Sequence, residues 1–80
     1  MKREEIKERV KKVISQVLNT DVSEISDDAN FIFDLGADSI QSVQLVAGFE
    51  EEFDIDMDEN KAKEVQTVSG AIDFIAGYLD

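Results

Sequence analysis

The chain has 80 residues with a formal net charge of −11 at pH 7, and it contains no cysteine, histidine or proline. This length provides one domain, residues 1–80, with a modest core, and the missing residue types exclude disulfides, thiolate metal sites and histidine-based catalysis. The charged start "MKREEIKERV" has no signal-peptide core and no stretch has the apolar length of a membrane span, so we expect a cytoplasmic protein without membrane contact.

The charge is unevenly distributed along the chain. Residues 1–20 carry six Lys/Arg and three Glu, a net +3, whereas residues 21–80 carry two Lys and sixteen Asp/Glu, a net −14. Such a surface should repel nucleic acid and anionic lipid and should attract basic proteins. The simpler interpretation, that the charge only keeps a small domain soluble, stays open at this point.

The first predicted element is an amphipathic helix in residues 4–19. Its apolar residues recur three and four positions apart on one stripe: Ile6, Val10, Val13, Ile14, Val17 and Leu18. Within this helix, Glu5 with Arg9 and Glu8 with Lys12 are i,i+4 pairs in the favourable order, so we expect them to form ion pairs.

The next segment, residues 19–38, loses this period and is rich in turn-forming Asn, Asp, Ser and Thr. We expect an ordered loop with one turn near "VSEI", lying against the core through its large apolar residues Val22, Ile25, Phe31, Phe33 and Leu35. "FIFDL" and "FDIDM" also alternate apolar and polar residues, which leaves open a small sheet of two short strands.

A second main helix is predicted from Ser39 to Phe53. Asp38 is a suitable N-cap, and Gln41 three residues later completes a capping box. The helix has a core face, formed by Leu45, Val46, Phe49 and Phe53, and a second apolar patch beside Ser39, formed by Ile40, Val43 and Ala47.

Two further helices complete the fold. A short one is expected in residues 58–65 with Asp58 as its cap, and a last one in residues 68–79 begins at Thr67 or Ser69. The last helix should bury Val68, Ile72, Ile75, Ala76 and Leu79. We therefore predict an all-α fold, a small four-helix bundle of three main helices and one short helix, with a long ordered loop between the first two.

The chemical signals converge on Ser39, which could be a nucleophile, a modification site or a cap. Catalysis by this serine needs a base, and nothing places either lysine beyond the first helix, Lys61 or Lys63, beside it. "ADSIQ" also fails to match the G-x-S-x-G elbow, so we predict that the chain is not an enzyme.

A calcium loop is also suggested by "DIDMDENKAKEV", which begins like an EF-hand. The pattern then fails, because Glu59 stands where glycine is needed and Val65 where a bidentate glutamate is needed. We predict no metal site.

What remains for Ser39 is a role at the helix start. Because Asp38 supplies the cap, the Ser39 hydroxyl is left free, and a helix N-terminus favours a bound phosphate. With an apolar patch beside it, the sequence allows a phosphate-accepting serine that other proteins contact. A serine at a helix start is more often simply a cap, and that interpretation stays open at this point.

The stretch "DLGADSIQSVQLVAGFEEEFDIDMDENKAKEVQTVSGAIDFI" resembles an acyl carrier protein, with "LGADS" at that family's attachment motif, and the likeness covers essentially the whole chain. The resemblance implies that a separate phosphopantetheinyl transferase adds 4'-phosphopantetheine from coenzyme A to Ser39. The thiol of that arm would carry acyl groups as thioesters to acyl-loading and acyl-processing enzymes of fatty-acid, lipid or polyketide-type biosynthesis. We expect the carrier to be a monomer.

The resemblance also assigns roles to other positions. Residues that match the surface docking to basic grooves of partner enzymes are Asp38, Ile40, Val43, Ala47, Glu50 and Glu51. Residues that match the lining sheltering a growing acyl chain are Val46, Phe49, Met57, Ala62, Val65, Ala71 and Phe74.

Some positions depart from the family pattern. Gln41 and Gln44 stand where fatty-acid-synthesis carriers usually have acids, Ala47 replaces a commonly larger docking residue and Phe49 a smaller lining residue. Isoleucine rather than leucine follows the serine, and Asp58 stands where proline or serine often precedes the third helix. These departures suggest a specialised carrier rather than a housekeeping one. A peptidyl or aminoacyl carrier, an unmodified acidic interaction module in which Ser39 is only a cap, and a calcium sensor remain the alternatives.

Overall fold

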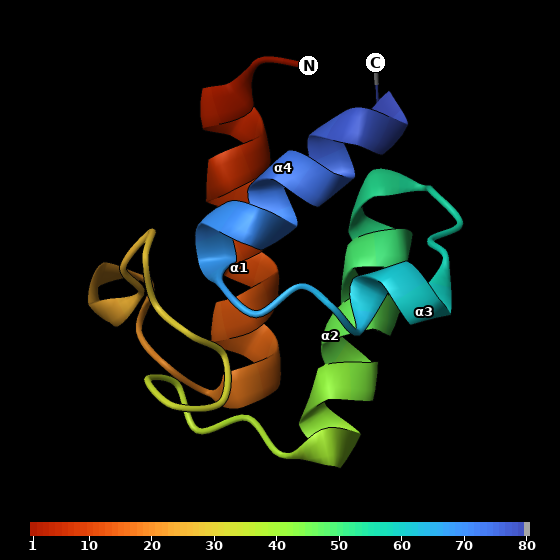
Figure 1. Cartoon of the computed structure of the whole chain (residues 1–80). Coiled ribbons are helices and arrows are strands. Elements are labelled where there is room, and N and C mark those ends of the chain that lie inside the picture. Colours follow the sequence, from red (N-terminus) through yellow and green to blue (C-terminus); the bar gives the residue numbers. More distant parts are fainter. Residues whose placement is uncertain (80) are drawn as a thin grey trace.

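The computed structural model describes residues 1–79, and in this range its regular elements are all helices, with one isolated β-bridge between Asn30 and Thr67 (Figure 1). The elements are α1 (Arg3–Leu18), the short 3₁₀ helix η1 (Val22–Glu24), α2 (Ser39–Phe53), α3 (Glu59–Ala62) and α4 (Val68–Leu79). The predicted all-α class is confirmed. The two-strand alternative is wrong, because "FIFDL" forms turns and "FDIDM" spans the end of α2 and the connection that follows it.

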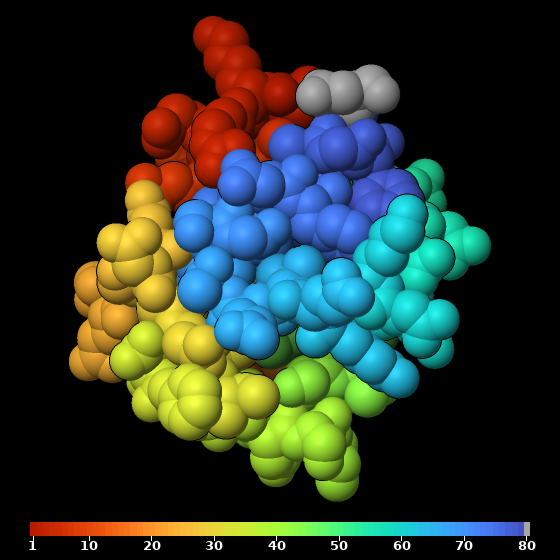
Figure 2. Space-filling view, in the orientation of Figure 1, coloured from red at the N-terminus to blue at the C-terminus, as the bar shows by residue number. Residues whose placement is uncertain are grey.

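Helix α1 is the centre of the packing, since it contacts both α2 and α4 and also η1. In Figure 1, α4 crosses α1 at an angle, and the start of α1 and the end of α4 lie at one end of the molecule. The loop that follows α1 and the start of α2 lie together at the opposite end. The space-filling view shows α4 flanked by this loop on one side and by α3 on the other (Figure 2).

The core follows the helical stripes. Buried side chains come from α1 (Ile6, Val10, Val13, Ile14), α2 (Leu45, Phe49, Phe53) and α4 (Val68, Ala71, Ile72, Ile75). Val46, Ala76 and Leu79 are only half-buried, at the edge of the core. The buried residues of α4 have the spacing i, i+3, i+4, i+7. Ala71 is therefore buried although the sequence did not predict it, and Ala76 and Leu79 are less buried than predicted.

The predicted caps at the helix starts are confirmed, and the structure adds two residues that end helices. Asn19 and Asp54 take the left-handed conformation after α1 and α2, and the Thr67 hydroxyl accepts a hydrogen bond of 3.1 Å from the Gly70 N–H at the start of α4. The Asp58 carboxylate caps α3 as expected, at 2.9 and 3.1 Å from the Asn60 and Lys61 N–H groups. Helix α3 itself is shorter than residues 58–65, because the chain turns after Lys63.

The loop between α1 and α2 is held against α4 by backbone hydrogen bonds. Phe31 N–H donates to Gln66, Val68 N–H to Ala29, and Ser69 N–H to Asp27, over 2.8–3.0 Å. The predicted turn near "VSEI" is η1.

The apolar side chains of this loop do not all face inward. Ile25 and Phe31 are buried and Leu35 packs against the core. The expectation was wrong for Val22 and Phe33, which are 46% and 87% exposed. Three consecutive apolar residues in a turn cannot all point to one side, so burial of Phe31 leaves Ile32 and Phe33 outside.

The basic residues of α1 pair with acids far away in the sequence. Arg9 Nε lies 2.7 Å and Lys12 Nζ 3.4 Å from the Glu52 carboxylate, and the Arg9 guanidinium stacks over the Phe53 ring. Within residues 1–79 the predicted pairs of Arg9 with Glu5 and of Lys12 with Glu8 do not form, because the end of α2 offers Glu52 instead.

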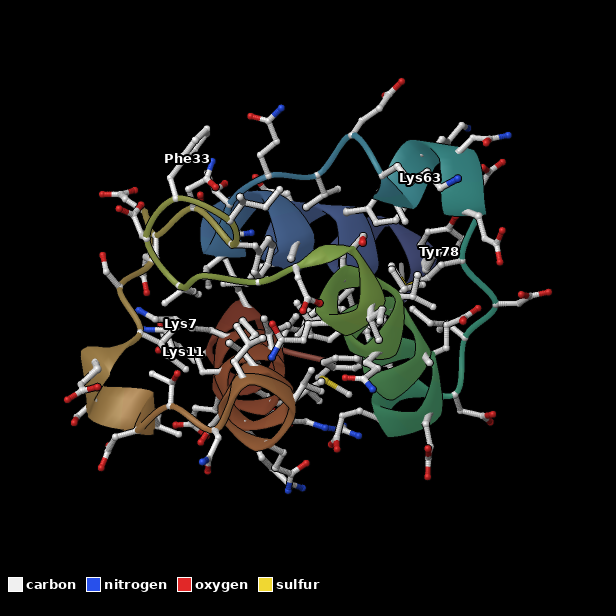
Figure 3. All side chains as sticks on the ribbon, turned by 90° about the horizontal axis from the view of Figure 1, so that it is seen from below. Lys7, Lys11, Phe33, Lys63 and Tyr78 are labelled. Carbon is white, nitrogen blue, oxygen red and sulfur yellow. The ribbon has the colours of Figure 1, made fainter. Side chains whose placement is uncertain are left out.

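A second set of cations fixes the loop and α4. Lys7 and Lys11 lie 2.8 and 2.7 Å from the Asp27 carboxylate, and Arg3 lies 2.6 Å from Asp73 (the two lysines are labelled in Figure 3). The two lysine ammonium groups lower the pKa of Asp27 to about 2. The positive charge of α1 is thus used mostly within the chain.

Candidate functional site

The site is the turn that leads into α2. Gly36 has φ of 74°, a left-handed conformation that suits glycine, and it allows Ala37 N–H to donate to Phe31 C=O at 2.8 Å. Ala37 is buried and anchors the turn in the core. The next two residues, Asp38 and Ser39, are therefore placed on the surface.

Asp38 is the N-cap of α2, as predicted. Its Oδ1 accepts from the Gln41 N–H at 2.7 Å, and Gln41 Oε1 accepts from the Asp38 N–H at 3.1 Å, so the capping box is complete. The Ser42 hydroxyl donates to the Asp38 carbonyl at 2.9 Å. These bonds fix the backbone around Ser39 without using its side chain.

Ser39 is the first residue of α2 and is exposed. Within residues 1–79 its hydroxyl makes no hydrogen bond, and the backbone N–H groups of Ser39 and Ile40 have no acceptor either. A phosphate joined to the Ser39 oxygen would meet these free donors and the positive end of the helix dipole. The residues present therefore fit a phosphodiester at this position.

The predicted docking residues form one exposed stripe along α2, with one exception. Ile40 and Val43 are 69% and 68% exposed, and Asp38, Ala47 and Glu51 are exposed as well. Glu50 is half-buried, and its Oε2 accepts from the Met57 N–H at 2.9 Å. Its carboxylate supports the chain between α2 and α3, so Glu50 contributes less to an outward surface than its neighbours.

The predicted lining residues belong to one apolar cluster. Phe49, Met57, Ala62 and Ala71 are buried in the core, and Val46, Val65 and Phe74 are half-buried against it. Of the seven, Phe74 borders a hollow of about 380 Å³ beside α3 and α4, together with Lys61, Asp73, Gly77 and Tyr78. Their role in sheltering an acyl chain stays a prediction.

Tyr78 closes this side of the molecule. Its hydroxyl accepts from the Asp58 N–H at 3.0 Å, and its ring meets the Phe74 ring edge-on at 5.2 Å (Tyr78 is labelled in Figure 3). The backbone N–H of Asp58, which a proline at this position would lack, thus has a hydrogen-bond acceptor in α4. The sequence reasoning did not identify this contact, which depends on two residues 20 positions apart.

The sequence did not predict that two large apolar residues of the loop before Ser39 lie on the surface. Ile32 is 60% and Phe33 is 87% exposed, in the loop before Ser39. The run "FIF" within a turn-forming stretch was the signal that could have indicated them.

No three or more His, Cys, Asp or Glu side chains in residues 1–79 are placed to hold a metal ion. No helix in this range has the length and apolarity needed to cross a bilayer.

A small helical domain that presents a free serine at the start of a capped helix has the geometry that a serine-linked phosphate arm requires. Residues 8–75, which include Ser39, match the family model described as "Phosphopantetheine attachment site". The chain therefore belongs to the phosphopantetheine attachment family, whose members bind 4'-phosphopantetheine covalently. Domains of this family are generally non-catalytic carriers that interact with phosphopantetheinyl transferases and acyl-processing enzymes.

Proposed function

We propose that this chain is an acyl carrier protein, which holds acyl intermediates as thioesters and presents them to biosynthetic enzymes. The observation that carries the proposal is the free, exposed Ser39 hydroxyl at the start of a helix whose cap is supplied by Asp38. Ser39 would receive the 4'-phosphopantetheine arm. When bound, the arm supplies the thiol that the cysteine-free chain lacks.

The chain's own residues position the attachment point. The capping box fixes the backbone at Ser39, and the free N–H groups of Ser39 and Ile40 would face the phosphate. No histidine is present, and the proton of the Ser39 hydroxyl would therefore leave to a base on the transferase. The carrier itself performs no catalysis in this proposal.

The docking surface and the lining are part of the same proposal. The exposed stripe of Asp38, Ile40, Val43, Ala47 and Glu51 suits a partner groove with apolar and basic side chains, with Glu50 in a mainly supporting role. The apolar cluster between α2, α3 and α4 would shelter the acyl chain. The protein would act as a cytoplasmic monomer.

Acyl cargo is favoured over aminoacyl or peptidyl cargo. The motif "LGADS" and the net charge of −14 in residues 21–80 both favour an acyl carrier. Gln41, Gln44 and Phe49 favour a specialised member, and full replacement of a housekeeping carrier in a reconstituted fatty acid synthase would contradict that part.

Loading with cargo tests the proposal. The modified protein is incubated with a malonyl- or acyl-loading transferase in one arm and with an adenylating aminoacyl-loading enzyme in the other, and its intact mass is measured. We expect an acyl mass gain that hydroxylamine removes, as a thioester requires. Ser39→Ala should take up nothing, whereas the matched Ser42→Ala variant should load normally. Aminoacyl loading alone would instead establish the peptidyl alternative.

A further inference from the structure

Ile32 and Phe33 form an apolar pair on the surface of the loop before α2. Phe33 is 87% and Ile32 60% exposed, and Figure 3 shows Phe33 projecting from the loop away from the helices. Single exposed apolar residues are common, but an aromatic ring left almost fully in water next to a second large apolar residue is informative.

The pair is held in this position by the loop backbone. Asn30 Oδ1 accepts from the Ile32 and Phe33 N–H groups at 2.9 and 3.0 Å, and Asp34 Oδ2 accepts from the Asn30 N–H at 2.7 Å. Every backbone N–H from Ala29 to Asp38 has an acceptor. Turning Phe33 inward would break several of these bonds, so the ring is presented outward by an ordered turn.

Charge indicates the chemistry of the surface that covers the pair. Asp28, Asp34 and Asp38 belong to the same segment between α1 and α2, are exposed and make no ion pair within residues 1–79. No Lys or Arg occurs between residues 13 and 60, and the nearby Lys7 and Lys11 are paired with Asp27. The complement is an apolar pocket edged by Lys or Arg. A second copy of the chain or an anionic membrane would bring repelling charge instead.

The position of the pair indicates which partner has this surface. The loop and the start of α2 lie at the same end of the molecule (Figure 1). Enzymes that act on the cargo react at the thiol, at the far end of the arm. A phosphopantetheinyl transferase must instead reach the Ser39 oxygen itself, and it needs basic side chains because it binds the phosphates of coenzyme A.

We propose that Ile32 and Phe33 are an apolar anchor for the phosphopantetheinyl transferase that modifies Ser39. This inference rests on the proposed function and adds a surface outside the α2 stripe. The pair acts in binding alone and takes no part in the transfer chemistry.

The test uses the unmodified full chain, coenzyme A and a broad-specificity phosphopantetheinyl transferase. Phe33→Ser and Ile32→Ser are compared with wild type and with Val22→Ser, a matched control because Val22 is 46% exposed on η1. Transfer kinetics give kcat and KM, and calorimetry of the unmodified chain with the transferase gives a Kd. We expect Phe33→Ser to raise KM and Kd about tenfold, as for a central apolar contact, with kcat and circular dichroism unchanged. Val22→Ser should behave as wild type.

Three results would overturn the anchor. Equal KM and Kd for wild type and both anchor variants would do so. A wild-type dimer in sedimentation that Phe33→Ser dissociates would overturn it, because the pair would then bind a second copy of the chain. Wild-type binding to phosphatidylglycerol vesicles that Phe33→Ser abolishes would also overturn it, because the pair would then bind a membrane. Failure of the wild type to be modified would count against the proposed function instead, and the Kd comparison, which needs no transfer, would still test the anchor.

Discussion

At the residue scale, Asp38 has two roles. Its carboxylate caps α2 through the Gln41 N–H, and its charge faces solvent beside Ser39. The sequence could predict the cap, because an Asp three positions before Gln at the start of an apolar period has few other roles. It could not predict that the Ser42 hydroxyl would be occupied by the Asp38 carbonyl, which distinguishes Ser42 from the free Ser39.

The two tasks of Asp38 can be separated by substitution. Asp38→Ala removes cap and charge and should lower the free energy of unfolding by about 1 kcal/mol, whereas Asp38→Asn keeps a good cap and should change it little. If the charge also guides a basic partner, both variants should show a higher KM with the transferase. Urea unfolding and transfer kinetics measure the two effects. A stable Asp38→Asn protein with wild-type KM would show that the residue is a cap only.

At the scale of elements, the helices were predictable and their long-range partners were not. The stripe of α1 and the caps Asp38, Asp58 and Thr67 are local signals that indicated where the helices begin, whereas α3 ends earlier than the sequence predicted. The ion pairs of Arg9 and Lys12 depend on where the end of α2 comes to lie, which local spacing cannot reveal. The exposure of Phe33 is equally hard to predict from local spacing, because it depends on whether Phe31 or Phe33 packs into the core.

The contact between α1 and α2 has little space at Gly48. A Cβ at Gly48 would lie 2.8 Å from Val13 Cγ1, whereas one at Gly77 in α4 would meet nothing within 4 Å. Gly77→Ala should therefore raise the free energy of unfolding by about 0.5 kcal/mol through helix propensity. Gly48→Ala should lower the free energy of unfolding by about 1 kcal/mol. The new methyl group would crowd the stiff, buried Val13 side chain, and this cost outweighs the gain in helix propensity. Urea unfolding of both variants checks this, and equal stabilisation would refute the close approach.

The Asp27 carboxylate joins the loop before α2 to α1 through ion pairs with Lys7 and Lys11. The ammonium groups of Lys11 and Lys7 lower the pKa of Asp27 to about 2, below its ordinary value of 3.8. A lowered folded-state pKa stabilises the fold above the unfolded pKa, and this contribution is lost as the pH falls from about 4 to about 2. The advantage of wild type over Asp27→Asn at pH 7 should therefore shrink across that window.

Unfolding at several pH values measures this difference. Asp28→Asn is the matched control, because Asp28 makes no ion pair within residues 1–79. A wild-type advantage that stays constant down to pH 2 would show that Asp27 does not hold the loop through its charge.

On the scale of the whole molecule, the net charge of −11 works against compactness. We expect repulsion within the acidic residues 21–80 to exceed the benefit of the ion pairs of α1, because most of the paired side chains are exposed or half-exposed. Raising ionic strength from about 0.01 M to about 0.1 M shortens the Debye length from about 30 Å to about 10 Å and should raise Tm. A Tm that falls over this range would show that the ion pairs dominate.

Intact mass spectrometry tests most directly whether Ser39 is an attachment point. The purified chain is incubated with coenzyme A and a broad-specificity phosphopantetheinyl transferase beside Ser39→Ala and Ser42→Ala. We predict a gain of one phosphopantetheine in the wild type and in Ser42→Ala, and none in Ser39→Ala. A folded wild type that gains no mass, or a Ser39→Ala protein that gains it, would contradict the assignment and leave Ser39 as part of a helix start only.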